Sequence, residues 1–148
     1  MSDDNIRAVG VDVGGSSVKA GLLDPERGIV DVCKADSIVG DPGAMADLMC
    51  GLAKRHNPDI VGVGTAGMIN HKTGLASASN LKWQNISLRK MLEERLNLPV
   101  WVDNDAQAAM MAEVHSGALA GARCAVYITL GTGVGGALFI DGRPWRGR

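Results

Sequence analysis

Two glycine-rich turns, each between apolar segments, constrain this sequence most. The first contains Gly14-Gly15 and follows residues 6–13; the second, residues 131–136, joins the apolar segments 124–130 and 134–141. Glycine lets the backbone approach a ligand closely, and exposed N–H groups in such turns hold phosphate oxygens. Neither turn is a Walker A loop, because no GK[ST] follows, and a strand follows where a Rossmann fingerprint needs a helix. One such turn is a weak signal, but two predict a ligand-binding α/β protein that grips a phosphate chain from two sides.

The hydrophobic pattern predicts alternating strands and helices between these turns. The expected strands are 6–13, 17–24, 29–38, 60–64, 100–102, 124–130 and 134–141, with two small hairpin strands around Met68 and Leu75. The first helix starts at an Asp41 cap with Pro42 and runs to about His56; the second runs from a Ser87 cap to about Leu96; the third runs from Asn104 to near Gly121,. This order favours an α/β fold with a mixed sheet and helices on both of its faces. We expect the last eight residues to be polar turn.

Composition excludes several function classes. The chain has 148 residues, which fits one domain, and 46% of them are hydrophobic, enough for a core,. The net charge is −1 with no Lys/Arg stripe, so we expect neither a nucleic-acid surface nor a membrane surface,. The acidic N-terminus is no signal peptide, which favours a cytoplasmic protein. Cys33, Cys50 and Cys124 form no CxxC pair and no metal-ligand pattern with the histidines, so free thiols are expected,.

Polar side chains around the first turn suit phosphate chemistry. Asp12 ends the first strand immediately before the turn, where its carboxylate could hold Mg²⁺ directly or through water,. Ser16 and Ser17 add hydroxyl donors, and Lys19 adds a positive charge. The alternative interpretation is an ordinary β-hairpin turn.

Three further segments carry candidate sugar-binding groups. In Asp103-Asn104-Asp105, Asp103 or Asn104 could be a helix N-cap, but a carboxylate at a helix N-terminus can also act as a general base towards a sugar hydroxyl,. The segment 64–67 is a small-residue turn at a strand end. In the segment 79–83, Asn80 could bond a polyol while Trp83 packs beneath the loop, or the loop is simply anchored by Trp83.

These segments together resemble the ROK family (repressors, open reading frames, kinases) of the actin/hexokinase/Hsp70-like superfamily, and most of all its bacterial glucokinases. The matching segments follow the family's order and spacing over nearly the entire chain. They are DVGGSSVKAGLLD at 12–24, GVGTAGMI at 62–69, SNLKW at 79–83, LPVWVDNDAQAAMMAE at 98–113 and LGTGVGGALFIDG at 130–142. The resemblance implies an actin/hexokinase-like (ribonuclease H-like) lobe.

The resemblance also implies roles for single residues. Asp105 would be the catalytic base that draws the proton from the 6-hydroxyl of a hexose, and Asp12 would help to position Mg²⁺ beside ATP. The residues implied to bind the sugar are Gly67, Asn80, Asn104 and Asp105. The residues implied to bind the nucleotide phosphates, besides Asp12, are Gly14, Gly15, Ser16, Ser17, Lys19, Gly131, Thr132, Gly133, Gly135 and Gly136.

The chain departs from the family in length. Family members are roughly twice as long, and their Glu-x-Gly-His sugar contacts and Cys-rich zinc motif should follow the second glycine turn. We therefore expect residues 1–148 to be an N-terminal lobe without its C-terminal lobe, with little or no activity alone. A structural zinc is expected only in the C-terminal lobe, and a homodimer in the full-length form. Ala66 stands where the family often carries proline.

Three other readings stay open. The first is a ROK DNA-binding regulator, for which the ten or so residues before Asp12 leave no room for a helix-turn-helix. The second is an actin-like or chaperone-like ATPase, which would not need VDNDA together with SNLKW. The third is a non-catalytic sugar-binding protein or truncated remnant. Among hexoses glucose is favoured, and the sequence leaves ATP and polyphosphate open as phosphoryl donors.

Overall fold

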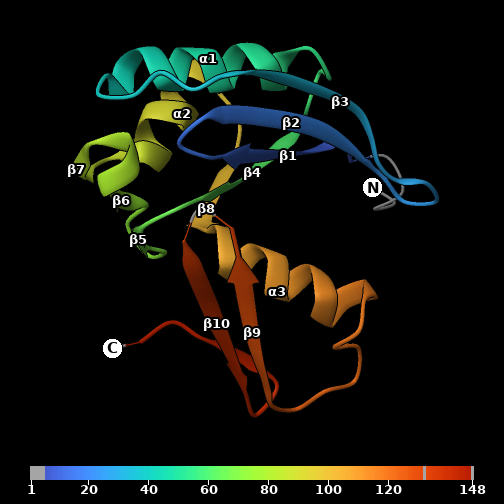
Figure 1. Ribbon diagram of the computed structural model, residues 1–148. Coiled ribbons are helices and arrows are strands. Elements are labelled where there is room, and N and C mark those ends of the chain that lie inside the picture. The colour runs from blue at the N-terminus through green and yellow to red at the C-terminus, as the bar shows by residue number, and fades with distance from the viewer. Residues whose placement is uncertain (1–5, 132, 148) are drawn as a thin grey trace. The chain divides into compact units, whose positions relative to one another are not determined.

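The computed structural model describes residues 6–131 and 133–147. Contacts within the chain divide it into two compact units, unit 1 (Met1–Asp103) and unit 2 (Asn104–Arg148). Among the described residues, unit 1 contains two α-helices, one short 3-10 helix and two sheets, and unit 2 contains one α-helix and a third sheet. Figure 1 shows these elements. Among the described residues no helix is long and apolar enough to span a membrane.

A five-stranded mixed sheet forms the centre of unit 1. Its strand order is β3-β2-β1-β4-β8, and β1 pairs antiparallel with β2 and parallel with β4. Val9, Val11 and Val13 alternate along β1 and are buried on one face,. The strands are β1 Ala8–Val13, β2 Ser17–Asp24, β3 Gly28–Asp36, β4 Ile60–Thr65 and β8 Val100–Asn104. The mixed sheet predicted from the sequence is confirmed.

Helix α1, Pro42–Lys54, packs against β1 and β2 (Figure 1). It begins as predicted: Asp41 is the N-cap, and its Oδ1 accepts a hydrogen bond of 2.9 Å from the Ala44 amide. Met45 and Met49 of α1 are buried in the same core as the β1 valines. This core fixes one face of the sheet beneath α1.

A small sheet and a second helix follow β4. The elements are β5 Met68–Asn70, β6 Leu75–Ala78, the 3-10 helix η2 Ser79–Leu81, β7 Trp83–Ile86 and α2 Leu88–Leu96. Trp83 is buried, which confirms that it packs beneath its loop. The sequence pattern did not reveal η2 and β7, because the chain reverses between them at Lys82 with φ 56°, a conformation that lysine rarely adopts,. Ser87 holds the predicted N-cap position of α2, but its side chain makes no capping hydrogen bond.

Unit 2 consists of helix α3 and a three-stranded sheet. Its elements are α3 Asp105–Ser116, β9 Ala125–Leu130, β10 Val134–Ile140 and β11 Arg143–Trp145, in the sheet order β11-β10-β9. Ala106 and Met110 of α3 pack with Ala137 and Phe139 of β10 to form its buried core. This packing holds α3 against β10, the strand that follows the second glycine turn.

Two expectations for unit 2 are wrong. Helix α3 ends at Ser116 and not near Gly121, because the Glu113 carboxylate accepts the Ala118 amide at 2.8 Å and its carbonyl accepts the Gly117 amide at 3.0 Å. The tail is also not all turn, because Arg143–Trp145 pairs with β10 as β11. Asp141 and Gly142 both have positive φ, 50° and 74°, as in a type I′ hairpin,. The Asp-Gly pair was the sequence signal that could have revealed this strand.

The two helix caps in unit 1 make a matched test of this fold. Substituting Asp41→Ala removes the hydrogen bond to the Ala44 amide, so we expect the free energy of unfolding to fall by about 1 kcal/mol,. Substituting Ser87→Ala removes no capping bond and should change it by less than about 0.5 kcal/mol,. Urea denaturation of both variants measures the difference. Equal losses would show that the Asp41 cap does not stabilise α1.

Candidate functional site

The first glycine turn, between β1 and β2, is held from outside by Ser37. The Gly14 amide donates to the Ser17 carbonyl at 3.0 Å, which closes the turn. The Ser37 hydroxyl donates to the Gly14 carbonyl at 2.6 Å, and the Ser37 amide donates to the Ser16 carbonyl at 3.1 Å. The tip of the turn, Gly15 and Ser16, is exposed. These two hydrogen bonds from Ser37 occupy carbonyl oxygens of the turn, which suits a turn whose tip binds an anion. No sequence signal had indicated this role of Ser37.

Asp12 and Lys19 are direct partners in the register of β1 and β2. The Asp12 Oδ2 lies 3.7 Å from the Lys19 Nζ, and both side chains are exposed. An exposed ion pair of this kind stabilises a fold by only about 0–1 kcal/mol. The Asp12 and Lys19 side chains can therefore exchange this pairing for contacts with a ligand at little cost in stability. Mg²⁺ commonly uses one or two carboxylates together with phosphate oxygens and waters. The carboxylate of Asp12, beside the ammonium group of Lys19, fits a Mg²⁺ ion that is held through water. Among the described residues, no group of three or more His, Cys, Asp or Glu side chains could hold a metal ion.

Asn80 lies against the first glycine turn, although 65 residues separate it from Gly15. A Cβ atom on Gly15 would lie 3.3 Å from the Asn80 Nδ2 atom, tighter than most such contacts. Asn80 is exposed and belongs to η2. Glycine at position 15 therefore makes room for the Asn80 amide, and unit 1 brings a predicted phosphate-binding turn and a predicted sugar-binding side chain together.

Gly67 lines a hollow in unit 1 of about 480 Å³. The other lining residues come from β5, β6, η2 and β7: Met68, Ser77, Ala78, Ser79, Lys82, Trp83 and Gln84. Gly67 has φ 102°, and a Cβ atom there would overlap the Ser77 carbonyl oxygen and lie 2.8 Å from the Ala78 Cα. Only glycine fits this position. The sequence indicated Gly67 but gave no role to Lys82 or Gln84, the long polar side chains of the same hollow.

In unit 2, Asn104 and Asp105 form the start of α3. The Asn104 Oδ1 accepts the amides of Ala106 at 3.0 Å and Gln107 at 3.2 Å, so Asn104 is the helix N-cap that the sequence left as an alternative. Asp105 is exposed, and its Oδ1 accepts the Ala106 amide at 2.8 Å. The N-terminal end of a helix favours a negative charge. Asp105 is thus a carboxylate at an exposed and electrostatically favourable position.

The second glycine turn connects β9 and β10, and the Gly131 amide donates to the Gly133 carbonyl at 2.9 Å. A Cβ atom on Gly131 or Gly133 would meet nothing within 4 Å, so packing does not require glycine at either position. Gly135 and Gly136 belong to β10, not to the turn. A Cβ atom on Gly135 would lie 3.6 Å from the Ala106 Cβ. The strand that leaves the turn therefore packs beneath the residue that follows Asp105.

Each unit thus gathers its own set of the predicted site residues. Unit 1 holds Asp12, Gly14, Gly15, Ser16, Ser17, Lys19, Gly67 and Asn80. Unit 2 holds Asn104, Asp105, Gly131, Gly133, Gly135 and Gly136, while Thr132 lies outside the described residues.

Known proteins resemble this chain in sequence and in fold. The ROK family model matches residues 8–148. The glucokinase of Streptomyces coelicolor is 36% identical over 144 residues, which cover 94% of this chain and 45% of that enzyme. The xylose repressor of Caldicellulosiruptor bescii is 36% identical over 88 residues, which cover 59% of this chain and 22% of the repressor. The crystal structure of a ROK family glucokinase from Streptomyces griseus, in complex with glucose and AMPPNP, matches with a TM-score of 0.85 and 35% identity, over 96% of this chain and 47% of that one.

The fold is therefore that of an actin/hexokinase-like α/β lobe, as the sequence had indicated. The chain belongs to the ROK family. It spans about half the length of the kinases that it matches, with 45% of the Streptomyces coelicolor enzyme covered.

Gly67 offers a direct test of the hollow's geometry. In Gly67→Ala the new methyl group would meet the Ser77 and Ala78 backbone at a φ that alanine avoids. We expect a loss of about 1–3 kcal/mol in the free energy of unfolding. The matched control is Gly131→Ala, which has open space around its Cβ and should lose far less. Chemical denaturation compares them, and a Gly67→Ala variant as stable as the control would contradict this geometry.

Proposed function

We propose that this chain is a lobe of an ATP-dependent sugar kinase, which transfers the γ-phosphoryl group to the 6-hydroxyl of a hexose. The observation that carries the proposal is the packing in unit 2, where Ala106, next to Asp105, is buried with Ala137 and Phe139 of β10, the strand that follows the second glycine turn. A candidate base and a candidate phosphate-binding turn are thereby held by one small core. Glucose is the favoured hexose, because the relatives from Streptomyces coelicolor and Streptomyces griseus are glucokinases.

Asp105 is the proposed general base. Its exposed carboxylate takes the proton of the 6-hydroxyl while the hydroxyl oxygen forms a bond to the γ-phosphorus. The bond between the γ-phosphorus and the bridging oxygen breaks, and ADP leaves with that electron pair. The transition state of such transfers is loose, so catalysis comes mainly from positioning and charge stabilisation.

The two glycine turns are the proposed phosphate contacts. The exposed tip at Gly15 and Ser16 would donate backbone N–H groups to phosphate oxygens, and Lys19 would add a positive charge,. Gly131 and Gly133, with open space where side chains would stand, let a phosphate chain approach the backbone,. Mg²⁺, when bound, would neutralise charge on the phosphate oxygens, and Asp12 is the residue proposed to hold it through water.

Gly67, Asn80 and Asn104 are the proposed sugar contacts, besides Asp105. The amide of Asn80 offers both a donor and an acceptor, which suits neighbouring hydroxyl groups. Its position against Gly15 would place a bound sugar beside the first phosphate turn, as in-line transfer requires. The Asn104 Oδ1 accepts the hydrogen bonds of the helix cap, and these bonds fix the direction in which the side chain points.

A second candidate is a sugar-responsive regulator, which the match to the xylose repressor supports. A regulator would use the same sugar-binding groups and would bind its sugar without forming ADP. A kinase would form one ADP and one sugar phosphate together. ADP formation that depends on the hexose therefore separates the two.

Asp105→Asn tests the proposed base in the natural protein that contains this chain. Asparagine keeps an oxygen to accept the Ala106 amide but cannot take a proton, so α3 should start normally. We expect kcat to fall on the order of 10²–10⁴-fold. A coupled assay of ADP release with glucose and ATP gives kcat and KM.

The control for this substitution is Glu94→Gln, which removes an exposed carboxylate on α2 and should leave kcat unchanged. Stabilisation of the Asp105→Asn variant by glucose in a thermal shift assay would show that the sugar site persists. Turnover close to that of the unsubstituted protein would rule out Asp105 as the base.

A further inference from the structure

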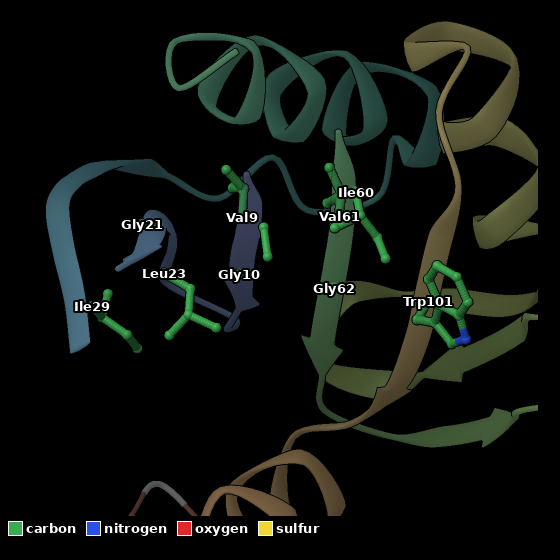
Figure 2. Close-up of a pocket in the computed structure, with 10 residues that line it drawn as sticks. Val9, Gly10, Gly21, Leu23, Ile29, Ile60, Val61, Gly62 and Trp101 are labelled. Atoms are coloured by element: carbon green, nitrogen blue, oxygen red, sulfur yellow. The ribbon is translucent and has the colours of Figure 1, made fainter. Parts of the chain in front are cut away.

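Strand β3 contains a β-bulge, which changes the face of the sheet on which its side chains lie. The register with β2 shifts between Ala20 and Leu22, and Asp31 of β3 has a φ of 52° at this point. In a regular strand Ile29 and Cys33, four residues apart, would share one face. Figure 2 shows Ile29 at an apolar hollow of about 370 Å³ on the face away from α1, whereas Cys33 packs against the core beneath α1. Bulges re-aim side chains in this way and are frequent beside active sites.

His56 follows the end of α1 and is buried beside this bulge, with only 2% of its side chain exposed. Its Nε2 atom lies 3.6 Å from the Cys33 Sγ atom. Its Nδ1 atom makes no hydrogen bond within the described residues, but the Asp31 Oδ2 atom lies 3.2 Å from it, within ion-pair distance. The buried imidazole therefore lies between a thiol and a carboxylate, and the Asp31 side chain is 81% exposed.

This order determines which nitrogen can receive a proton from the thiol. A proton on Nδ1 faces the Asp31 carboxylate, which favours the tautomer that carries it there,. Nε2 then keeps its lone pair and accepts the proton of Cys33, because the Leu52 carbonyl oxygen lies farther from Sγ, at 3.8 Å. A base that a third group orients towards a weak nucleophile is a general arrangement for activating that nucleophile.

The charges near His56 favour transfer of this proton. The carbonyl end of α1 and the Asp31 carboxylate both favour a positive imidazolium,. Positive groups nearby favour a negative thiolate, since Lys54 is in the last turn of α1 and the Arg7 guanidinium donates to the His56 carbonyl oxygen at 2.6 Å. The thiolate and the imidazolium also neutralise each other in a place where an isolated charge would be costly.

We propose that Cys33, His56 and Asp31 form an activated-thiol site, at which His56 takes the thiol proton and the Cys33 thiolate reacts with hydrogen peroxide. The sulfur forms a bond to one peroxide oxygen, and the bond between the two oxygens breaks. The other oxygen leaves with that electron pair as hydroxide, which takes the proton from His56 and becomes water. Sulfur loses two electrons and becomes a sulfenic acid, and the peroxide gains the same two. None of the three residues belongs to the proposed kinase site, so the proposal does not depend on it.

The alternative is that Cys33 is an ordinary thiol, and the other cysteines of the chain separate the two cases. All three are free: Cys124 is exposed, Cys33 is half-buried and Cys50 is buried. Burial raises the pKa of the Cys50 thiol, so Cys50 should react most slowly. Exposure alone predicts that Cys124 reacts fastest, whereas activation by His56 predicts that Cys33 does.

Iodoacetamide labelling of the natural protein that contains this chain measures all three rates in one sample. Lys34, Lys54 and Arg123 place the cysteines on different tryptic peptides, which mass spectrometry quantifies separately. An ordinary exposed thiol has a pKa of about 8.5, so roughly 1% of it is thiolate at pH 6.5. At this pH we expect Cys33 to react roughly tenfold or more faster than Cys124. A Cys33 rate equal to or below that of Cys124 would overturn the proposal.

Asp31→Asn tests the carboxylate without disturbing the fold. Asparagine adopts a positive φ readily, so the bulge should persist while the charge beside Nδ1 is lost,. We expect the Cys33 rate at pH 6.5 to fall roughly two- to fivefold. The control is Asp36→Asn, which removes an exposed carboxylate from the same strand and should leave the rate unchanged. Equal rates for the two variants would show that Asp31 does not act on the thiol.

His56→Gln removes the proposed base, because a glutamine side chain cannot take the thiol proton. We expect the Cys33 rate to fall roughly tenfold or more, while the Cys124 rate stays the same. Circular dichroism shows whether this variant folds, and if it does not, the comparison of Cys33 with Cys124 and the Asp31→Asn result decide. An undiminished Cys33 rate in folded His56→Gln would exclude His56 as the base.

Hydrogen peroxide in the presence of dimedone, which traps sulfenic acids, tests the reaction itself. We expect the trapped product mainly on the Cys33 peptide at pH 6.5, and roughly tenfold less of it in the His56→Gln variant. Equal trapping on the Cys33 and Cys124 peptides, or trapping on neither, would contradict a peroxide-reactive site at Cys33.

Discussion

The backbone pairing of β1 with both of its neighbours determines where the site residues of unit 1 lie. Val13 pairs with Val18 of β2 and with Thr65 of β4, so β1 and β4 end at the same edge of the sheet. The first glycine turn leaves β1 at this edge, and the segment leading to Gly67 leaves β4 there. Ligands of α/β proteins bind at the carboxyl ends of parallel strands. Slipping this register by one residue would bury Asp12 and expose the valines, so packing beneath α1 fixes the register and with it the site.

The strands and helices of this chain were largely predictable, because valine alternation and cap residues are local signals. The starts of α1 and α3 were predictable from Asp41 and Asn104, whose side chains bond the first helical amides. The end of α3 was not, because it depends on the Glu113 carboxylate reaching Ala118. Strand β11 was overlooked although the Asp-Gly turn before it is a recognised hairpin signal,.

The candidate site was predictable as residue types but not as contacts. Asp12 and the glycine turns stand out in the sequence, yet the placement of Asn80 beside Gly15 depends on the tertiary fold. Ser37 holds the first turn from the end of a different strand, and a lone serine after a strand carries no signal of that role. Lys82 reverses the chain in a left-handed conformation that sequence alone does not assign to lysine. Long-range placement is the part that local pattern cannot supply.

Within each unit, a glycine-rich segment lies close to residues of the candidate site. Gly15 makes room for Asn80 in unit 1, and in unit 2 Gly135 of β10, the strand that follows the second turn, lies close to Ala106 at the start of α3.

The central claim is that these groups serve phosphoryl transfer to a sugar. The most direct measurement is phosphorus NMR of the natural protein that contains this chain, incubated with ATP, Mg²⁺ and glucose. The account predicts that the γ-phosphate signal disappears while the signals of ADP and of a hexose 6-phosphate rise in equal amounts, and only when the sugar is present. Release of inorganic phosphate at a rate unaffected by any hexose would contradict it.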